Sequence, residues 1–215
     1  MTTSGGGTGA ASTFSRIISG ELPARWESNE PGRRVVCFHN RLKWERVMLL
    51  VVPRVYMTQQ QLWRNDTLCD ALRMAVQFGE ELCPEGFRVL SNFGEAAHQS
   101  QLHGHIHVIS GLARTIESAE LHGEVERHGN ILTQRCRVDG APHADRYLLD
   151  GSKSQHDLLT SEGIVELADA AISHAESFSP GGFRLMANYL TNEAGVKGGP
   201  PGLFMLGGGQ LDLYV

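Results

Sequence analysis

A seven-residue segment occurs twice in this 215-residue chain, and the repeat restricts the folds that the chain can adopt. Residues 86–92 read GFRVLSN, and residues 182–188, found 96 positions later, read GFRLMAN. The spacing holds without gaps through the preceding segments 66–82 and 162–178, whose apolar residues recur with helical periodicity. We therefore predict an internal duplication, in which each unit contains strands, one long helix and two returning strands.

Three histidines alternate with other residues just after the first copy of the repeat. In the segment LHGHIHVI, residues 102–109, the histidines are His103, His105 and His107. Successive side chains of an extended strand point to opposite faces, so this spacing predicts three imidazoles on one face. Such a row can supply a nucleophile, a proton carrier and an anion-binding group near neutral pH, or it can hold a metal ion.

Three ordered blocks of the sequence resemble the signature of the histidine triad (HIT) superfamily. They are residues 14–24 (FSRIISGELPA), residues 37–40 (CFHN) and residues 86–111, which contain the triad. A short motif alone carries a high risk of a false match, whereas three blocks in the correct order are specific. The resemblance implies an α+β protein with a HIT-like fold, in which antiparallel sheets carry packed helices.

The resemblance also implies roles for individual residues. His105 would be the nucleophile, His107 would hydrogen-bond the phosphate, and His103 would orient its neighbours. Ser100 and Gln99 would contact phosphate or leaving-group oxygens. The nucleotide-binding positions of the family correspond to Asn92, Asn40, Phe14, Ile17, Phe38 and His98.

The activity that the resemblance implies is that of a nucleotide hydrolase or nucleotidyltransferase. It would act on the α-phosphate of a nucleotide conjugate, such as a phosphoramidate or a dinucleoside polyphosphate, through a nucleotidyl-histidine and without a cofactor or metal. Two departures leave alternatives open: Asn40 replaces the ribose-binding Asp of the family, and Met48 stands where a supporting His is expected. The alternatives are a nucleotide-binding protein with little or no catalytic activity, and a metal-binding module that uses the triad.

The second copy of the repeat lacks the triad chemistry. At the same spacing, Gly199, Pro201 and Leu203 stand opposite the three histidines. We therefore predict a HIT domain over residues 13–111 and a degenerate HIT-like repeat over residues 112–215. The two would form a pseudo-dimer within one chain, which would be a monomer or a weak homodimer. Galactose-1-phosphate uridylyltransferase resembles this arrangement in carrying two HIT-like halves. At the end of the second half of this chain, residues 207–215 are predicted to add an edge strand.

Composition limits the partners and the compartment. A net charge of −5 argues against a protein that binds nucleic acid mainly by electrostatics. No apolar stretch approaches the roughly 20 residues of a membrane span. The four cysteines show no Cys-x-x-Cys spacing, which favours reduced thiols in a cytoplasmic protein. The partner that the resemblance implies is a small nucleotide substrate, and composition argues against both nucleic acid and membrane. Residues 1–12, rich in Gly, Ser and Thr, are predicted to be a disordered leader.

Overall fold

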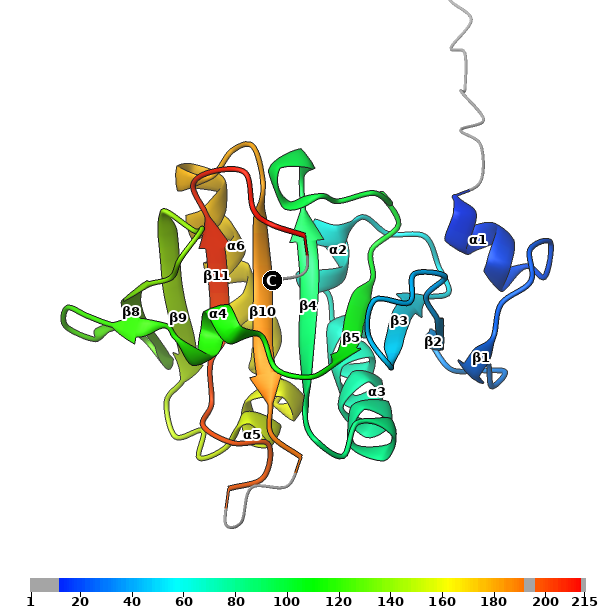
Figure 1. Ribbon diagram of the computed structural model, residues 1–215, viewed down its shortest axis with the longest axis horizontal. Helices are drawn as coiled ribbons and strands as arrows, with labels where there is room; N and C mark the ends of the chain where they lie inside the picture. The colour runs from blue at the N-terminus through cyan, green and yellow to red at the C-terminus, as the bar shows by residue number, and fades with distance from the viewer. Residues whose placement is uncertain (1–11, 192–195, 214–215) are drawn as a thin grey trace, which may run out of the picture.

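One antiparallel sheet runs through the computed structural model, which describes residues 12–191 and 196–213 (Figure 1). The first half of the chain contributes β1 (Trp26–Ser28), β2 (Val35–His39), β3 (Met48–Pro53), β4 (Phe87–Phe93) and β5 (Ile106–Ser110). The second half contributes β6 (Glu120–Leu121), β7 (Glu126–His128), β8 (Ile131–Arg137), β9 (His143–Leu149), β10 (Phe183–Tyr189) and β11 (Leu203–Gly207). In space the strands follow the order β1-β2-β3-β5-β4-β10-β11-β9-β8-β6, and β7 pairs with β8.

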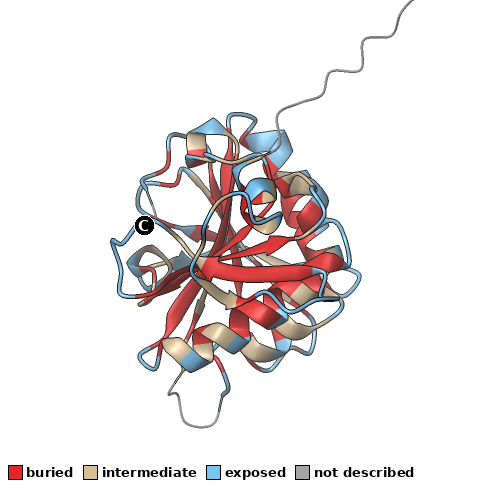
Figure 2. Ribbon diagram, turned by 90° about the vertical axis from the view of Figure 1, so that its right-hand side faces the viewer, coloured by how far each residue is buried: buried red, intermediate tan, exposed pale blue. Residues whose placement is uncertain are grey.

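Helices cover both faces of this sheet. They are α1 (Thr13–Ile18), α2 (Gln59–Trp63), α3 (Thr67–Leu82), α4 (Arg114–Glu117), α5 (Gln155–Thr160) and α6 (Ile164–Phe178), together with the 3-10 turn η1 (Glu95–Ala97). The apolar faces of α2, α3, α5 and α6 form the main core on one face. On the other face, α1 packs against β2, and a smaller apolar cluster lies between the halves of the sheet. The central strands are accordingly buried, whereas the outer helix faces are exposed (Figure 2). No helix in the described part of the chain is long and apolar enough to cross a membrane.

The two halves meet at an antiparallel pair formed by β4 and β10, near the middle of the sheet. The pairing is centred on Leu90 and Met186, which are also counterparts in the sequence repeat. Two stacked ring pairs lie on either side of this centre, Phe87 on Tyr189 and Phe93 on Phe183, with centroids 4.6 and 4.5 Å apart. Such two-fold pairing is expected of two related halves joined side by side, while their origin by duplication stays a prediction.

The structure confirms the predicted α+β class and both long helices, which occur as α3 and α6. It contradicts the edge strand predicted for residues 207–215. Gly208, with φ of 86°, turns the chain away from the sheet, and β11 lies between β10 and β9 rather than at an edge. Leu211 is then buried on the first half, where its N–H donates to the Ala96 carbonyl at 2.8 Å. Val215 lies outside the described residues.

The N-terminal boundary also differs from the prediction at one residue. Residues 1–11 of the predicted leader lie outside the described residues. Ser12, which the sequence placed at the end of that leader, is the N-cap of α1 and accepts a hydrogen bond from the Ser15 N–H. A serine oxygen at this position satisfies one of the free N–H groups of the first helical turn. The ordered fold therefore includes Ser12.

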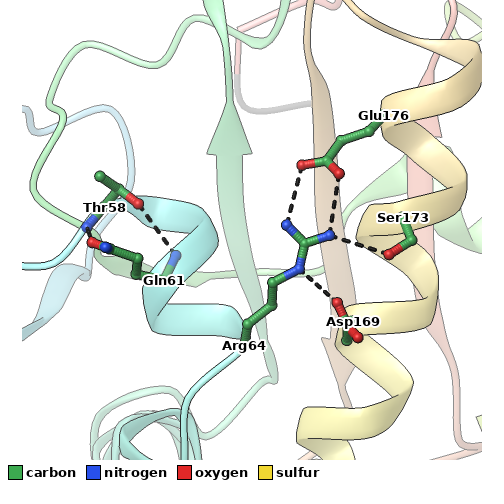
Figure 3. Close-up of polar contacts among 6 residues, drawn as sticks. All are labelled: Thr58, Gln61, Arg64, Asp169, Ser173 and Glu176. Carbon is green, nitrogen blue, oxygen red and sulfur yellow. Dashed lines mark hydrogen bonds and ion pairs between the residues drawn. The ribbon is translucent and has the colours of Figure 1, made fainter.

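Helix α2 is short, and polar contacts fix both of its ends (Figure 3). At its start, the side chain of Thr58 accepts from the Gln61 N–H, and the side chain of Gln61 accepts from the Thr58 N–H. This reciprocal capping box sets the first residue of the helix at Gln59. At its end, Arg64 reaches across to α6, where it contacts Asp169, Ser173 and Glu176 at 2.6 to 3.2 Å.

Replacing Arg64 with methionine should lower the free energy of unfolding by about 1 kcal/mol, because its ion pairs form a network but remain partly exposed. Urea denaturation of the full chain would measure this change, and 1 M salt should reduce it. Arg73→Met is the matched control, since Arg73 makes only a 3.4 Å contact to the Thr160 carbonyl and a 3.7 Å pair with Glu162. Equal effects of the two substitutions would contradict a specific clamp at Arg64.

Candidate active site

The triad lies where the chain enters β5, on the side of the sheet that α1 covers. Only His107 lies within the strand, because β5 begins at Ile106. The predicted single strand therefore does not include His103 and His105. Instead, the buried side chain of Gln59 takes the place of a neighbouring strand: its Oε1 accepts from the His105 N–H at 3.0 Å, and its Nε2 donates to the His105 carbonyl at 2.9 Å.

Glycine between the first two histidines lets α2 approach closely. A Cβ atom at Gly104 would lie 2.8 Å from the Thr58 carbonyl oxygen and 3.0 Å from the Leu62 Cβ. The Gly104 N–H donates to the Met57 carbonyl at 2.7 Å, which fixes this approach. Because any larger residue would push α2 outward, Gly104 is required for Gln59 to reach the backbone of His105.

The hydrogen bonds of His105 determine which of its ring nitrogens carries the proton. Its Nδ1 lies 2.8 Å from the His103 carbonyl oxygen. A carbonyl can only accept, so Nδ1 is the protonated nitrogen and Nε2 holds the lone pair. That Nε2 lies 3.1 Å from the Nε2 of His107. Since one of the two must donate, the Nε2 of His107 carries a proton and Nε2 of His105 accepts from it.

Both rings are neutral at pH 7 because they are buried. Desolvation lowers the pKa of His105 to about 4, and a bond to the His103 carbonyl only partly opposes it. For His107, desolvation and then the charges of His105 and Arg184 hold the pKa well below its ordinary value. A neutral His105 keeps its Nε2 lone pair, which a nucleophile requires.

Titration of the His105 imidazole by NMR should therefore show a midpoint near pH 4, with the neutral ring persisting through pH 6. The unfolded chain, with an ordinary histidine pKa, binds this proton first as the pH falls. The free energy of unfolding should thus decrease between about pH 6.5 and pH 4. His105→Asn should lose this part of the pH dependence. A midpoint near 6.5 in the folded protein would contradict the neutral, buried ring.

His103 is held between two elements and supports the site. Its Nε2 donates to the Pro53 carbonyl at 2.9 Å, so its Nδ1 can accept from the Ser12 hydroxyl, also at 2.9 Å. The ring lies beside those of Phe14 and Tyr56. These contacts join the start of α1 to the end of β3, while the orienting role that the resemblance implies stays a prediction.

A cavity of about 690 Å³ opens beside the histidines. Seven of the predicted site residues line it: Phe14, Ile17, Phe38, Asn40, Ser100, His105 and His107. Three of them form an apolar wall from α1 and β2. The Phe14 ring lies edge-on to His105, with centroids 5.1 Å apart. The remaining wall contains four cations and two carboxylates, namely Arg25, Arg41, Lys43, Arg46, Glu27 and Glu45. The cavity wall is therefore positively charged, although the protein as a whole is acidic.

The other predicted residues do not line this cavity. Gln99 closes its own loop, since its Oε1 accepts from the Gly94 N–H at 2.8 Å and its Nε2 donates to the Gln101 carbonyl at 3.0 Å. His98, in the left-handed backbone region with φ of 59°, donates through Nε2 to the Leu211 carbonyl at 2.7 Å. It therefore holds the C-terminal segment against the loop, a contact that sequence analysis could not anticipate.

Two further predicted positions have partners within the chain. The Oδ1 atom of Asn40 accepts from the Leu42 N–H at 3.1 Å, which leaves its amide group on the cavity wall. Asn92 is buried in β4 and accepts from Arg184 of β10. Met48, where the family has a supporting histidine, is a buried residue of β3 and belongs to the apolar cluster between the halves.

Sequence analysis missed several residues that hold His105 in place. Besides Gln59, the Ser91 hydroxyl donates to the His105 carbonyl at 2.7 Å, and the Trp63 Nε1 donates to Ser91 at 3.0 Å. One signal could have indicated Gln59, because the repeat places Gln155 opposite it. Ser91 has no such signal, since its counterpart is Ala187.

A metal centre formed by the triad finds no support in this arrangement. Across the described ranges, no group of three or more His, Cys, Asp and Glu side chains is placed to hold a metal ion. Carbonyl oxygens accept from the Nε2 of His103 and from the Nδ1 of His105, so both of those nitrogens carry protons and cannot be ligands.

Comparison with known proteins identifies a HIT domain in the first half of the chain. The HIT domain family model matches residues 33–113. A DUF4931 family protein from Bacillus cereus has 9% identity and a TM-score of 0.55, over 87% of this chain and 86% of that one. A uridylyltransferase has 15% identity and a TM-score of 0.55, over 88% and 80% of the two chains. A GalT-like protein from Arabidopsis thaliana has 11% identity and a TM-score of 0.54, over 88% of this chain and 78% of that one.

These structures share the fold across both halves of the chain, since each alignment covers 87% or more of it. The predicted HIT-like α+β fold is thereby confirmed. The family match spans the β2–β3 pair, α3, the β4–β5 pair and all three histidines. Residues 33–113 form a HIT domain, and the fold shared across both halves supports a protein of the HIT superfamily.

Proposed function

We propose that this chain is a nucleotide hydrolase or nucleotidyltransferase that attacks the α-phosphate of a nucleotide conjugate with His105. One observation carries the proposal: the Nδ1 proton of His105 is bound to the His103 carbonyl, so the unprotonated Nε2 belongs to a ring that lines the cavity. The HIT domain supports it, and so does a fold shared with a uridylyltransferase.

The reaction would proceed in two displacements. The Nε2 of His105 attacks the α-phosphorus, the bond from phosphorus to the leaving group breaks, and a nucleotidyl-histidine forms. The leaving group takes up a proton from solvent, while the Nε2–H of His107, which hydrogen-bonds His105 in the free protein, stays on its ring and donates to a phosphate oxygen. Water or another acceptor then attacks the phosphorus and loses its proton to solvent, and the bond from phosphorus to the Nε2 of His105 breaks, which releases the nucleotide. The free protein is thereby regenerated.

The cavity suits a nucleotide in size and in character. Its volume lies within the range of about 300–1,000 Å³ that is typical of small-molecule sites. A base would pack between Phe14, Ile17 and Phe38, where the wall is apolar and aromatic. The phosphate would lie between the histidines and the Ser100 hydroxyl, and the surrounding cations would attract its charge.

A substrate screen with purified full-length protein tests this function. Adenosine phosphoramidate, a dinucleoside polyphosphate and a nucleotide sugar would be supplied in the presence of EDTA, because no cofactor is required. Release of a nucleoside monophosphate identifies a hydrolase, and transfer to added phosphate or sugar phosphate identifies a transferase. Tight nucleotide binding without release of any product would instead favour the alternative of a binding protein with little catalytic activity.

We also propose that the second half binds no nucleotide and that it supplies the sheet usually given by a partner subunit. The counterparts of the triad are Gly199, Pro201 and Leu203, and Pro201 has no N–H to offer a phosphate. The edge of β4 that faces away from β5 is already paired with β10. A second copy of the chain cannot pair there.

Calorimetric titration with a nucleoside monophosphate should accordingly give one bound nucleotide per chain. Substitution of Ser100, which lines the cavity, should weaken this binding. Substitution of Asn188 should change only stability, because both ends of its amide bond the backbone of Ala113. Two equivalent nucleotides per chain would overturn the proposal that the second half is empty.

A further inference from the structure

A buried arginine from the second half reaches the active-site strand of the first. Arg184 lies on β10, directly opposite Asn92 of β4, and its side chain is 1% exposed. Its Nε donates to the Asn92 Oδ1 at 2.7 Å, and another of its nitrogens donates to the Asp212 carbonyl at 2.8 Å. A guanidinium offers its donors in a fixed plane, so these two bonds determine its orientation.

This pair lies beside the triad. Leu90 of β4 is the register partner of His107, and Asn92 follows two residues later on the same face of the sheet. The charge of Arg184 also contributes to the lowered pKa of His107, which places the guanidinium within electrostatic reach of that ring. Arg184 is thus close to the ring that would donate a hydrogen bond to the phosphate.

The bond to Arg184 fixes which way the Asn92 amide points. Because Oδ1 accepts from the guanidinium, the Nδ2 group is the end of the side chain that remains able to donate. A bound phosphate or its leaving group offers only acceptors to such a donor. Without Arg184, the amide could rotate and present its oxygen to an anion, which would repel it.

We propose that Arg184 is a positioning residue of the active site, which holds the Asn92 amide in the orientation that donates to the substrate's phosphate or leaving group. The proposal rests on the proposed function, and it gives the second half a direct part in that function. The half that lacks a triad then contributes a charged side chain to the working site as well as a sheet.

The repeat provides a matched control. Arg88 occupies the equivalent position in β4, lies opposite Asn188, and is likewise buried. It donates to the carbonyls of Ser110 and Gly111, while Asn188 bonds the backbone of Ala113. Among the described residues, Arg88 thus contacts the chain between the halves and Glu45, at 3.6 Å, rather than Asn188.

The test is a double-mutant cycle on full-length protein with Arg184→Gln, Asn92→Ala and their combination. Release of AMP from adenosine phosphoramidate gives kcat and KM, and calorimetry gives the affinity for AMP. Arg184→Gln should lower kcat about ten- to a hundredfold, as loss of a residue that orients a reacting group usually does. In the Asn92→Ala background it should add less than about twofold, because its effect passes through that amide. Arg88→Gln should leave kcat within about twofold.

Thermal unfolding of each variant separates this role from loss of structure. If Arg184→Gln does not fold, Arg184→Lys replaces it throughout the cycle, since lysine keeps the charge but not the planar fork. Additive effects of the Arg184 and Asn92 substitutions, or equal losses at Arg184 and Arg88, would overturn the proposal. If the unmodified chain turns over none of the three conjugates of the substrate screen, the proposed function fails. The cycle is then measured on AMP affinity, and an unchanged affinity in the Arg184 variant would overturn the positioning role.

Discussion

Nucleotide turnover should fall at least about a thousandfold when His105 is replaced by alanine, because the covalent step then has no nucleophile. The ring is the only part of His105 that the substitution removes. The bonds from Gln59 and Ser91 reach its backbone, so the chain should keep its fold. Turnover of a conjugate labelled at the α-phosphate measures the loss, and circular dichroism checks the fold.

Covalent labelling provides the sharper readout of this prediction. The unmodified protein, quenched in acid-free denaturant during turnover, should carry the labelled nucleotide, and the His105→Ala variant should not. His122→Ala is the control, because His122 is an exposed histidine that does not line the cavity. If the label still became attached to the His105→Ala protein, another residue would be the nucleophile.

Replacing Gln59 with alanine should affect both stability and turnover. The substitution leaves the buried N–H of His105 without its acceptor and opens a space under α2, at a cost of about 2–4 kcal/mol in unfolding free energy. It also releases the backbone that carries the nucleophile, so kcat should fall by about tenfold or more. Urea denaturation and steady-state kinetics on the same preparation measure the two effects.

Gln155 is the matched control for Gln59 in the second half. Its Oε1 accepts from the Gly202 N–H at 2.7 Å, while its Nε2 has no hydrogen-bond partner among the described residues. Gln155→Ala should therefore lower stability but leave kcat close to that of the unmodified chain. A comparable fall in kcat for both variants would show that Gln59 acts through general stability rather than through His105.

The sequence was sufficient to predict the features that depend on local pattern. Helical periodicity predicted α3 and α6. Alternation predicted the strand that contains His107, although this strand begins only at Ile106. The order of the three blocks predicted a HIT-like fold. Each of these signals lies within a short segment, or in a spacing between segments, and can be read without knowing which strands are neighbours.

Contacts between distant segments could not be predicted in this way. The start of β5 depends on Gln59, which is 46 residues away from His105 in the chain. His98 bonds Leu211, and Asn92 bonds Arg184, because the C-terminal segment and β10 fold against the first half. Sequence analysis predicted that His98 and Asn92 bind a nucleotide, whereas these contacts show that both also have partners within the chain.

The joint between β4 and β10 has a further consequence for how the site behaves on dilution. In an assembly of separate subunits, contacts across such a joint weaken as the protein concentration falls, because folding and association are linked. Here both strands belong to one chain, so the contact between Arg184 and Asn92 has no dissociation constant. The specific activity of this protein should then be independent of its concentration, down to the most dilute assay that can detect it.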